Sequence, residues 1–344
     1  MEQQVDAAFV KALPKIELHA HLTGSISPQC LHAIWSQKRA SGTALVLDDP
    51  LVACRPVGEH HDIFTFFKVF DTYIYGLVND REAVAFATRQ VLADFEEDGV
   101  RYLELRTTPR ESLATGLTKE AYVETVLDAL AEANTRGHMP TYLILSIDRR
   151  NTKEQAMRVV ELAIRYQSRG IVGIDLCGNP LRGDVTIFKD AFEAARSAGL
   201  KITLHFAEMP ESSTPVELTT LLSYLPDRIG HVINVPPDVE AEIEGRGIGL
   251  ELCLSCNVHA KMITGSFPDH HFGKWYKRTC PLALCTDDVG IFGSPISNEY
   301  LLASQHFCLS GKDLVGLCRR AVPCIFGPPE EKSRLLMLLD DVDS

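Results

Sequence analysis

The sequence predicts an α/β protein of the (β/α)8 barrel class. Short β-rich apolar runs recur along the chain, stretches with helical periodicity separate them, and the runs number eight. Strands that alternate with helices are typical of βα units in a parallel sheet, and eight such units close into a barrel. An open doubly wound sheet is the alternative. Such a sheet usually carries a glycine-rich phosphate loop, and neither G-x-G-x-x-G nor G-x-x-x-x-G-K-[ST] occurs here.

The strand candidates follow one another at the spacing that βα units need. They are residues 16–21, 100–106, 142–147, 171–176, 202–206, 228–231, 248–254 and 282–286. Amphipathic stretches between them predict helices at 80–97, 119–135, 153–167 and 185–198, several opened by Asn, Asp or Thr and closed by Gly. No linker or repeat divides the chain. We therefore expect one domain over residues 1–344.

The longest stretch outside the repeating pattern follows the first strand, over about residues 41–76. We interpret it as a helical lid inserted into the barrel. Its aromatic side chains could cover a bound ring and exclude water. These are Phe64, Phe66, Phe67 and Phe70, with Asp71 as a further contact to substrate. Aromatic residues at helical spacing also serve in ordinary packing, which is the alternative.

Composition narrows the classes of partner. Acidic residues outnumber basic ones by 46 to 34, which gives a net charge of −12 and argues against nucleic acid as a ligand. No apolar run approaches the roughly 18 residues of a membrane span, and residues 1–13 lack the features of a secretion signal. The ten cysteines lie mostly in apolar runs and are expected to be reduced. We expect a soluble, cytoplasmic monomer.

Chemically active residues gather where the predicted strands end. His19 and His21 close the first strand, and residues two apart in a strand point to the same side. In a barrel, catalytic groups lie at the carboxyl ends of the strands. Two histidines at such an end are by themselves as often satisfied polar residues as metal ligands.

Three later strands end in the same kind of residue. His205 lies at the end of the fifth strand with Glu208 just beyond it, the sixth ends at His231, and the eighth is followed by Asp287 and Asp288. Taken singly, a histidine here could bind a carbonyl and an Asp pair could cap a helix. Four histidines and three carboxylates on one rim instead favour a metal-dependent active site.

These motifs resemble those of the adenosine deaminase family in order and spacing. The matching segments are His19-Ala20-His21, Asp175-Leu176-Cys177-Gly178, His205-Phe206-Ala207-Glu208, Gly230-His231 and Thr286-Asp287-Asp288. The resemblance extends from residue 14 to about residue 326. The cytidine-type zinc deaminases are excluded, because their H-x-E and P-C-x-x-C signatures are absent. Cys253 and Cys256 form a lone C-x-x-C, which we interpret as core packing.

The resemblance implies one zinc ion per chain and a role for each site residue. Zinc would be held by His19, His21, His205 and Asp287, and it would lower the pKa of a water to about 7. The activated water would attack C6 of a purine, with His231 to orient or deprotonate it. Glu208 would protonate ring N1, Asp288 would bind N7, the Gly178 amide would bind N3, and His21 would also border the substrate. The product would be a 6-oxopurine.

Two departures from classical adenosine deaminases indicate a nucleotide substrate. Those enzymes carry an acidic residue where this chain has Thr23, beside the ribose 5′-hydroxyl. A carboxylate about 4 Å from one phosphate charge would cost roughly 4 kcal/mol at an effective dielectric constant near 20. The neutral Thr23, with Ser25 nearby, therefore admits a 5′-monophosphate.

The second departure follows the second strand, at Thr107, Thr108, Pro109 and Arg110. Hydroxyls and a guanidinium suit a phosphate, although a solvated loop arginine is the alternative. These features, and the run containing His270 and His271, resemble the branch of the family that acts on N6-methyl-AMP. We assign those two histidines no catalytic role and expect a packed or capping pair.

Three other functions remain open at this point. They are a plain adenosine deaminase, a more distant amidohydrolase that opens a cyclic amide, and a catalytically silent nucleotide-binding protein on the same barrel. Silent members of such families usually lose a metal ligand or the acid. All of these residues are present here, which favours an enzyme acting on a purine nucleoside monophosphate.

Overall fold

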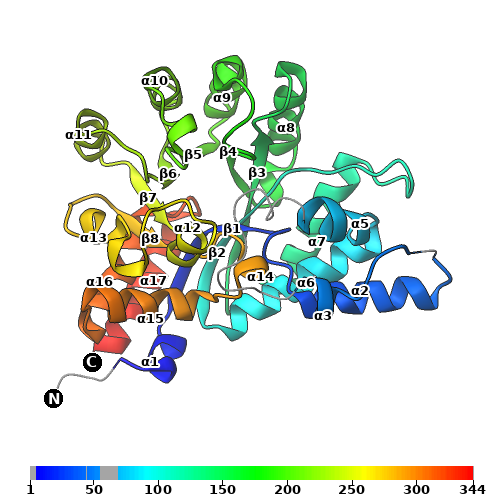
Figure 1. Ribbon diagram of the computed structural model, residues 1–344, viewed down its shortest axis with the longest axis horizontal. Coiled ribbons are helices and arrows are strands. Elements are labelled where there is room, and N and C mark those ends of the chain that lie inside the picture. The colour runs from blue at the N-terminus through cyan, green and yellow to red at the C-terminus, as the bar shows by residue number, and fades with distance from the viewer. Residues whose placement is uncertain (1–4, 44, 55–68, 344) are drawn as a thin grey trace.

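Eight parallel strands form the centre of the computed structural model, which describes residues 5–43, 45–54 and 69–343 (Figure 1). Each strand pairs with the next in the chain, in the order β1 to β8. They are β1 (Lys15–His21), β2 (Val100–Thr107), β3 (Thr141–Asp148), β4 (Ile171–Cys177), β5 (Lys201–Phe206), β6 (Arg228–His231), β7 (Gly249–Leu252) and β8 (Leu282–Leu284). A parallel bridge between Ala20 and Asp287 joins the segment just after β8 to β1. The predicted (β/α)8 barrel is confirmed.

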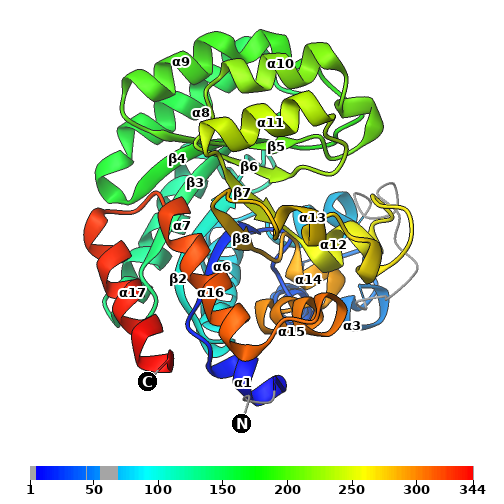
Figure 2. The ribbon, with the colours of Figure 1, turned by 90° about the vertical axis from the view of Figure 1, so that its left-hand side faces the viewer.

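Helices surround the barrel, with α8 to α11 packed along one side of it (Figure 2). The helices are α1 (Ala7–Ala12), α2 (Pro28–Ala40), α3 (Pro50–Ala53), α5 (Tyr75–Leu77), α6 (Arg81–Glu97), α7 (Lys119–Asn134), α8 (Lys153–Arg165), α9 (Lys189–Ser197), α10 (Pro215–Ser223), α11 (Pro237–Arg246), α12 (Leu254–His259), α13 (Phe272–Trp275), α14 (Val289–Phe292), α15 (Ile296–Phe307), α16 (Gly311–Ala321) and α17 (Pro329–Asp343). Within the described ranges, none is long and apolar enough to cross a membrane.

Local sequence explains where several helices begin and end. Thr152 caps α8 in a reciprocal capping box with Gln155, and Asp80 caps α6 by accepting from the Ala83 amide. Gly247 ends α11 in the left-handed conformation, at φ +63°. The predicted helix at 185–198 is divided, because a 3-10 turn (Val185–Phe188) precedes α9.

The last two strands are shorter than predicted. β7 ends at Leu252, because the chain turns into α12 at Leu254. β8 ends at Leu284, and the Thr286 amide donates to the side chain of Glu17 at 3.0 Å. The backbone beyond β8 is therefore turned into the barrel mouth. This turn carries Asp287 and Asp288.

The barrel interior holds buried charges in addition to the usual apolar side chains. Glu104, Arg106, Arg228 and Glu251 are each 1% exposed or less. Glu251 accepts from Arg106 Nη2 and from Arg228 Nε, both at 2.6 Å, and Arg228 also lies 2.7 Å from Glu104. Burying a charge is costly unless it is paired, and each of these has an oppositely charged partner. We call these four residues the interior charge ladder.

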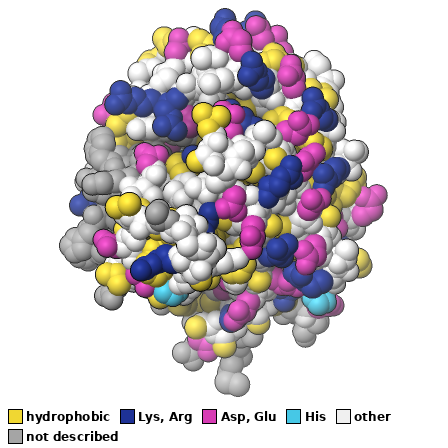
Figure 3. Space-filling model, turned by 90° about the vertical axis from the view of Figure 1, so that its right-hand side faces the viewer, with side chains coloured by type: hydrophobic (Ala, Val, Ile, Leu, Met, Phe, Trp, Pro, Cys, Tyr) yellow, Lys and Arg dark blue, Asp and Glu magenta, His cyan; other side chains and the backbone are white. Residues whose placement is uncertain are grey.

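The stretch that we expected to form a helical lid is only partly helical where it is described. Its described parts contain α3, a π-helical turn (Phe70–Ile74) and α5. Phe64, Phe66 and Phe67, which we expected to cover the substrate, lie outside the described residues. Phe70 is described and is 7% exposed. On the face drawn in Figure 3, Lys and Arg side chains are mixed with Asp and Glu, and no continuous basic stripe appears.

Candidate active site and metal centre

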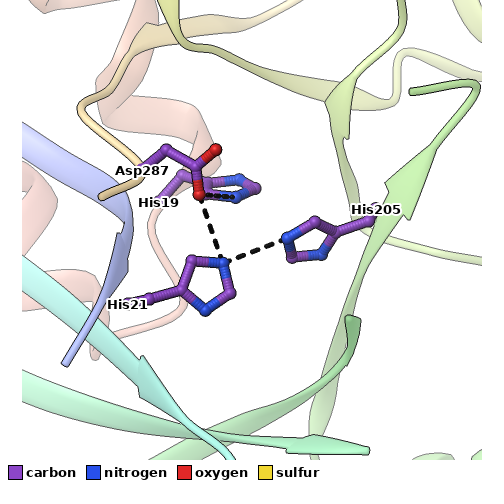
Figure 4. A group of neighbouring side chains, drawn as sticks. All are labelled: His19, His21, His205 and Asp287. Carbon is purple, nitrogen blue, oxygen red and sulfur yellow. Dashed lines mark hydrogen bonds and ion pairs between the residues drawn. The ribbon is translucent and has the colours of Figure 1, made fainter. Parts of the chain in front are cut away.

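Four side chains converge at the carboxyl end of the barrel (Figure 4). His19 and His21 come from β1, His205 comes from β5, and Asp287 follows β8. Asp287 Oδ1 lies 3.3 Å from Nε2 of both His19 and His21, and His21 Nε2 lies 3.1 Å from His205 Nε2. One ligand atom from each of the four residues lies within 4.8 Å of the others. The structure thus brings together the four residues expected to hold the metal.

Two buried carboxylates determine which ring nitrogen of these histidines faces the cluster. His19 Nδ1 bonds Glu251 Oε2 at 2.7 Å, and His205 Nδ1 bonds Asp175 Oδ1 at 3.1 Å. A carboxylate accepts a hydrogen bond from Nδ1–H, which leaves the Nε2 lone pair free for a metal ion. His19 Nε2 is buried and has no hydrogen-bond partner.

The chemistry of this donor set fits a divalent cation. Three imidazole nitrogens and one carboxylate oxygen suit zinc, whose sites combine His and Asp ligands. Burial opposes ionisation of Asp287, but the adjacent His19 and His21 hold the pKa of that carboxyl well below its usual range. A metal ion requires an ionised aspartate, which this pKa shift favours, and imidazole nitrogens that give up their protons when it binds.

Two further carboxyls border the cluster, and their pKa values are raised, whereas that of Asp287 is lowered. Burial raises the pKa of Glu208 to about 7, and its Oε2 has no hydrogen-bond partner. Burial and the charge of Asp287 raise the pKa of Asp288 well above its usual range. A Cβ on Gly24 would stand 1.4 Å from Asp288 Oδ1, so only glycine allows this approach. Both carboxyls can hold a proton near neutral pH and donate it.

His231 lies below the same rim and is fully buried. Its Nε2 is 3.8 Å from Asp287 Oδ2 and 3.9 Å from Glu208 Oε1. Burial lowers the pKa of His231 well below its usual value, which favours the neutral ring. Both His231 and Asp287 adopt positive φ angles, +67° and +64°. Such strained backbone at two strand ends is typical of functional sites.

A pocket of about 350 Å³ opens above the cluster. That volume lies within the range of small-molecule sites. The expected site residues that line it are His21, Thr23, Asp71, Thr108, Arg110, Gly178, His205, Glu208, Asp287 and Asp288, together with Phe70 of the expected lid. His19 and His231 are buried beneath this lining.

Three residues expected to bind substrate do not line this pocket. The Thr107 hydroxyl turns away from the barrel mouth and bonds the Tyr122 hydroxyl at 2.7 Å. Pro109 lies beside the pocket residues but is not among them. Ser25 borders a separate cavity between α6 and the segment that follows β8. In alternating backbone, adjacent residues point to opposite sides, which separates Thr107 from Thr108.

The pocket also contains residues that motif reasoning missed. They are Tyr75, Asp148, Arg150, Cys177, Asn179, Arg182, Cys256 and Met262. Arg150 and Arg182 follow the carboxyl ends of β3 and β4, and this position was the available signal for them. The Arg110 guanidinium lies 3.1 Å from the centre of the Tyr75 ring.

The interpretation of Cys256 as core packing is incomplete, because the side chain is buried in the core and also reaches the site. Its thiol donates to Asp287 Oδ2 at 2.8 Å and borders the pocket. Cys253 is fully buried in the core, as expected, and its sulfur also lies within 4.8 Å of a ligand atom of His231 and of Asp287. The two cysteines of the C-x-x-C therefore differ in role, because the chain enters α12 between them.

Comparisons with known proteins agree with this geometry. The family model described as adenosine deaminase matches residues 14–342. An N6-methyl-AMP deaminase of Danio rerio is 37% identical, with 97% of this chain and 96% of the relative covered. The structure of an Arabidopsis N6-mAMP deaminase superposes with a TM-score of 0.89 at 37% identity, covering 97% of this chain and 99% of that one. An Arabidopsis structure complexed with IMP gives a TM-score of 0.88 at 37% identity, with 97% and 98% covered.

Proposed function

Because the chain belongs to the adenosine deaminase family and is a hydrolytic deaminase of C–N bonds, we propose that it converts 6-substituted purine nucleoside monophosphates to 6-oxopurine nucleotides. The substrate we propose is N6-methyl-AMP, which gives IMP and methylamine. Support comes from relatives whose names state this activity and from the Arabidopsis relative that binds IMP.

The metal we propose is one zinc ion per chain, held by His19, His21, His205 and Asp287. Bound zinc supplies Lewis acidity and lowers the pKa of a water to about 7. Asp175 and Glu251 keep two of the ligand rings in the tautomer that zinc needs. The buried Nε2 of His19, which has no hydrogen-bond partner and lies 3.3 Å from Asp287 Oδ1, supports this assignment.

Glu208 carries the acid step in this proposal. Attack at C6 of an aromatic ring requires an acceptor for the displaced electrons, and protonation of ring N1 provides it. A carboxyl delivers that proton only if it is still protonated when the substrate binds. Burial raises the pKa of Glu208 to about 7, which keeps a large fraction protonated at neutral pH.

Groups that line the pocket orient the purine ring of the proposed substrate. Burial and the charge of Asp287 keep Asp288 protonated, so it can donate to N7. Gly178 adopts φ +103°, a conformation that favours glycine, and turns its backbone at the pocket wall where the amide can meet N3. With both edges of the purine held, C6 faces the metal centre and N1 faces Glu208.

The phosphate end of the proposed substrate lies near the pocket mouth. Thr23 and Thr108 offer neutral hydroxyls, and three guanidiniums line the same pocket, from Arg110, Arg150 and Arg182. Arg150 is paired with Asp148 by two hydrogen bonds of 2.7 and 2.9 Å, so part of its charge is already balanced. Arg110 and Arg182 are therefore the cations we assign to the phosphate.

The observation that carries this proposal is a protonatable Glu208 beside a three-histidine, one-aspartate cluster in a pocket lined by arginines. The test is a substrate panel of adenosine, AMP and N6-methyl-AMP on protein of known zinc content, with products identified by mass spectrometry. We expect the highest kcat/KM for N6-methyl-AMP. Fastest turnover of adenosine would refute the nucleotide assignment, and no turnover of any purine would refute the deaminase.

A further inference from the structure

A chain of hydrogen bonds runs to the back of His231, on the side away from the pocket. The Phe272 amide donates to His270 Nδ1 at 3.0 Å, and His270 Nε2 lies 3.2 Å from Asn257 Oδ1. Asn257 Nδ2 lies 3.1 Å from His231 Nδ1. His231, Asn257 and His270 are 3% exposed or less. We call Phe272, His270, Asn257 and His231 the histidine relay.

The donor at the outer end of the relay, the Phe272 amide, determines which atom donates in each of the other hydrogen bonds. A backbone amide can only donate, so His270 Nδ1 must accept the bond from Phe272. The proton of the His270 ring then resides on Nε2, which donates to Asn257. Burial and the adjacent His271 lower the pKa of His270 well below its usual value, in agreement with a neutral ring.

The same logic orients Asn257. Its Oδ1 accepts from His270, so its Nδ2 is the atom that faces His231 and the Sδ of Met262, 3.5 Å away. An amide nitrogen has no lone pair to accept with, and therefore it donates to His231 Nδ1. The lone pair of His231 is on Nδ1, and its proton is on Nε2, the nitrogen directed at the pocket.

We propose that Asn257 and His270 are positioning residues that fix His231 in the Nε2–H tautomer, so that His231 acts as a hydrogen-bond donor to the reacting atoms and not as a base. This inference rests on the proposed function for its effect on turnover. The Nε2–H points at the space between Asp287 Oδ2 and Glu208 Oε1, at 3.8 and 3.9 Å. A nitrogen that already carries a proton cannot remove one from a water, but it can stabilise negative charge on an oxygen.

The relay also gives a role to one of the two adjacent histidines, His270 and His271, to which we assigned no catalytic role from the sequence. His270 sets the orientation of Asn257, whereas His271 donates from Nε2 to the backbone carbonyl of His231 at 2.5 Å. The two rings stack at 4.1 Å between centroids. The expectation of a packed or capping pair holds for both residues, because the two rings are stacked and His270 accepts from the first amide of α13. In addition, His270 is connected through Asn257 to the ring of His231.

The decisive variant is Asn257→Asp. A carboxylate at this position can only accept, so it draws the proton of His231 to Nδ1 and leaves Nε2 as a lone pair. Long-range proton–nitrogen NMR of histidine-labelled protein reports which ring nitrogen carries the proton, with His231→Gln used to assign the signal. We expect Nε2–H in the wild type and Nδ1–H in Asn257→Asp. Nδ1–H in the wild type would overturn the proposal.

Turnover supplies a second readout. Reversing the tautomer of a catalytic histidine costs up to about 10⁴-fold in kcat in other hydrolases, and we expect a loss of at least about 10²-fold in Asn257→Asp at unchanged zinc content. Wild-type kcat in this variant would overturn the role. The NMR result needs no substrate, so a correct tautomer in a protein that fails the substrate panel would count against the proposed function alone.

A pair of substitutions at His270 separates positioning from packing. His270→Gln keeps an N–H for Asn257 Oδ1, whereas His270→Leu removes it and frees the amide to rotate. We expect His270→Leu to lower kcat by about tenfold with little change in KM, and His270→Gln to retain most of the activity. His271→Gln is the matched control and leaves the tautomer of His231 unchanged. Equal losses in the Leu and Gln variants would overturn the assignment.

Discussion

Replacing Glu251 by Gln tests whether a carboxylate inside the barrel orients the proposed metal ligand His19. Glu251 is fully buried and accepts four bonds, from His19 Nδ1, Arg106, Arg228 and Thr203, at 2.6 to 2.8 Å. Gln is nearly the same size and keeps one acceptor oxygen. It removes the negative charge and presents an amide group that can face His19 or the arginines with the wrong polarity.

The size of the effect follows from the two kinds of partner that Glu251 has. Loss of a carboxylate that orients a metal-binding histidine weakens metal binding by about 10- to 100-fold, or roughly 1.4 to 2.7 kcal/mol. Removing one member of a buried ion pair also lowers the free energy of unfolding by about 3–5 kcal/mol. Arg106 and Arg228 retain Asp175 and Glu104 as partners, so the lower end of that range is expected.

The matched control is Glu104→Gln, in the same interior charge ladder. Glu104 is also fully buried and bonds Arg228 and Tyr102, but it touches none of the four proposed metal ligands. Zinc affinity is measured by chelator competition, and stability by urea unfolding of the metal-free protein. Both variants should lose stability, and only Glu251→Gln should lose zinc affinity. Equal zinc affinity in the two variants would show that Glu251 does not orient His19.

Three more predictions concern the reaction and the metal. Glu208→Gln should keep its zinc and lose about 10²- to 10⁴-fold in kcat, because an amide cannot supply the proton; steady-state kinetics with unchanged turnover would remove Glu208 from the acid role. Thr23→Asp should lower kcat/KM for the monophosphate by up to about 10³-fold, from the roughly 4 kcal/mol repulsion at 4 Å, and should spare adenosine. Equal losses on both substrates would contradict the phosphate argument. Chelation should abolish turnover and lower the melting temperature, with recovery on adding zinc; full activity without metal would exclude the metal-dependent mechanism.

The fold was predictable because each local signal agreed with the others. Predicted strand positions matched the observed ones to within a few residues, and helices α6, α7 and α8 begin within one residue of expectation. The misjudged ends lie where tertiary contacts override the local pattern. β8 is the example, because the Glu17 side chain takes the Thr286 amide out of the strand.

The site was predictable in its outline for a physical reason. Parallel strands deliver their carboxyl ends to one rim, so histidines and carboxylates at those ends must meet. The side to which a loop side chain points cannot be inferred from the sequence in the same way. Thr107 and Thr108 are adjacent in the sequence, yet one bonds Tyr122 in the core and the other borders the pocket. The relay through Asn257 depends on contacts between residues 13 or more positions apart, which no motif encodes.

The proposed metal ligands are oriented by neighbouring buried side chains, and these are separate from the loop residues at the pocket mouth. His19 is held by Glu251, His205 by Asp175, and Asp287 by the Cys256 thiol. No described residue bonds the second ring nitrogen of His21, and His21 is the cluster member with the most exposed side chain, at 16%. The carboxylates that orient the first two ligands are themselves fixed by the arginines in the barrel. We therefore expect substitutions among the pocket arginines to change the affinity for the proposed nucleotide without moving the proposed metal ligands, because the two sets of residues share no hydrogen bond in the described structure.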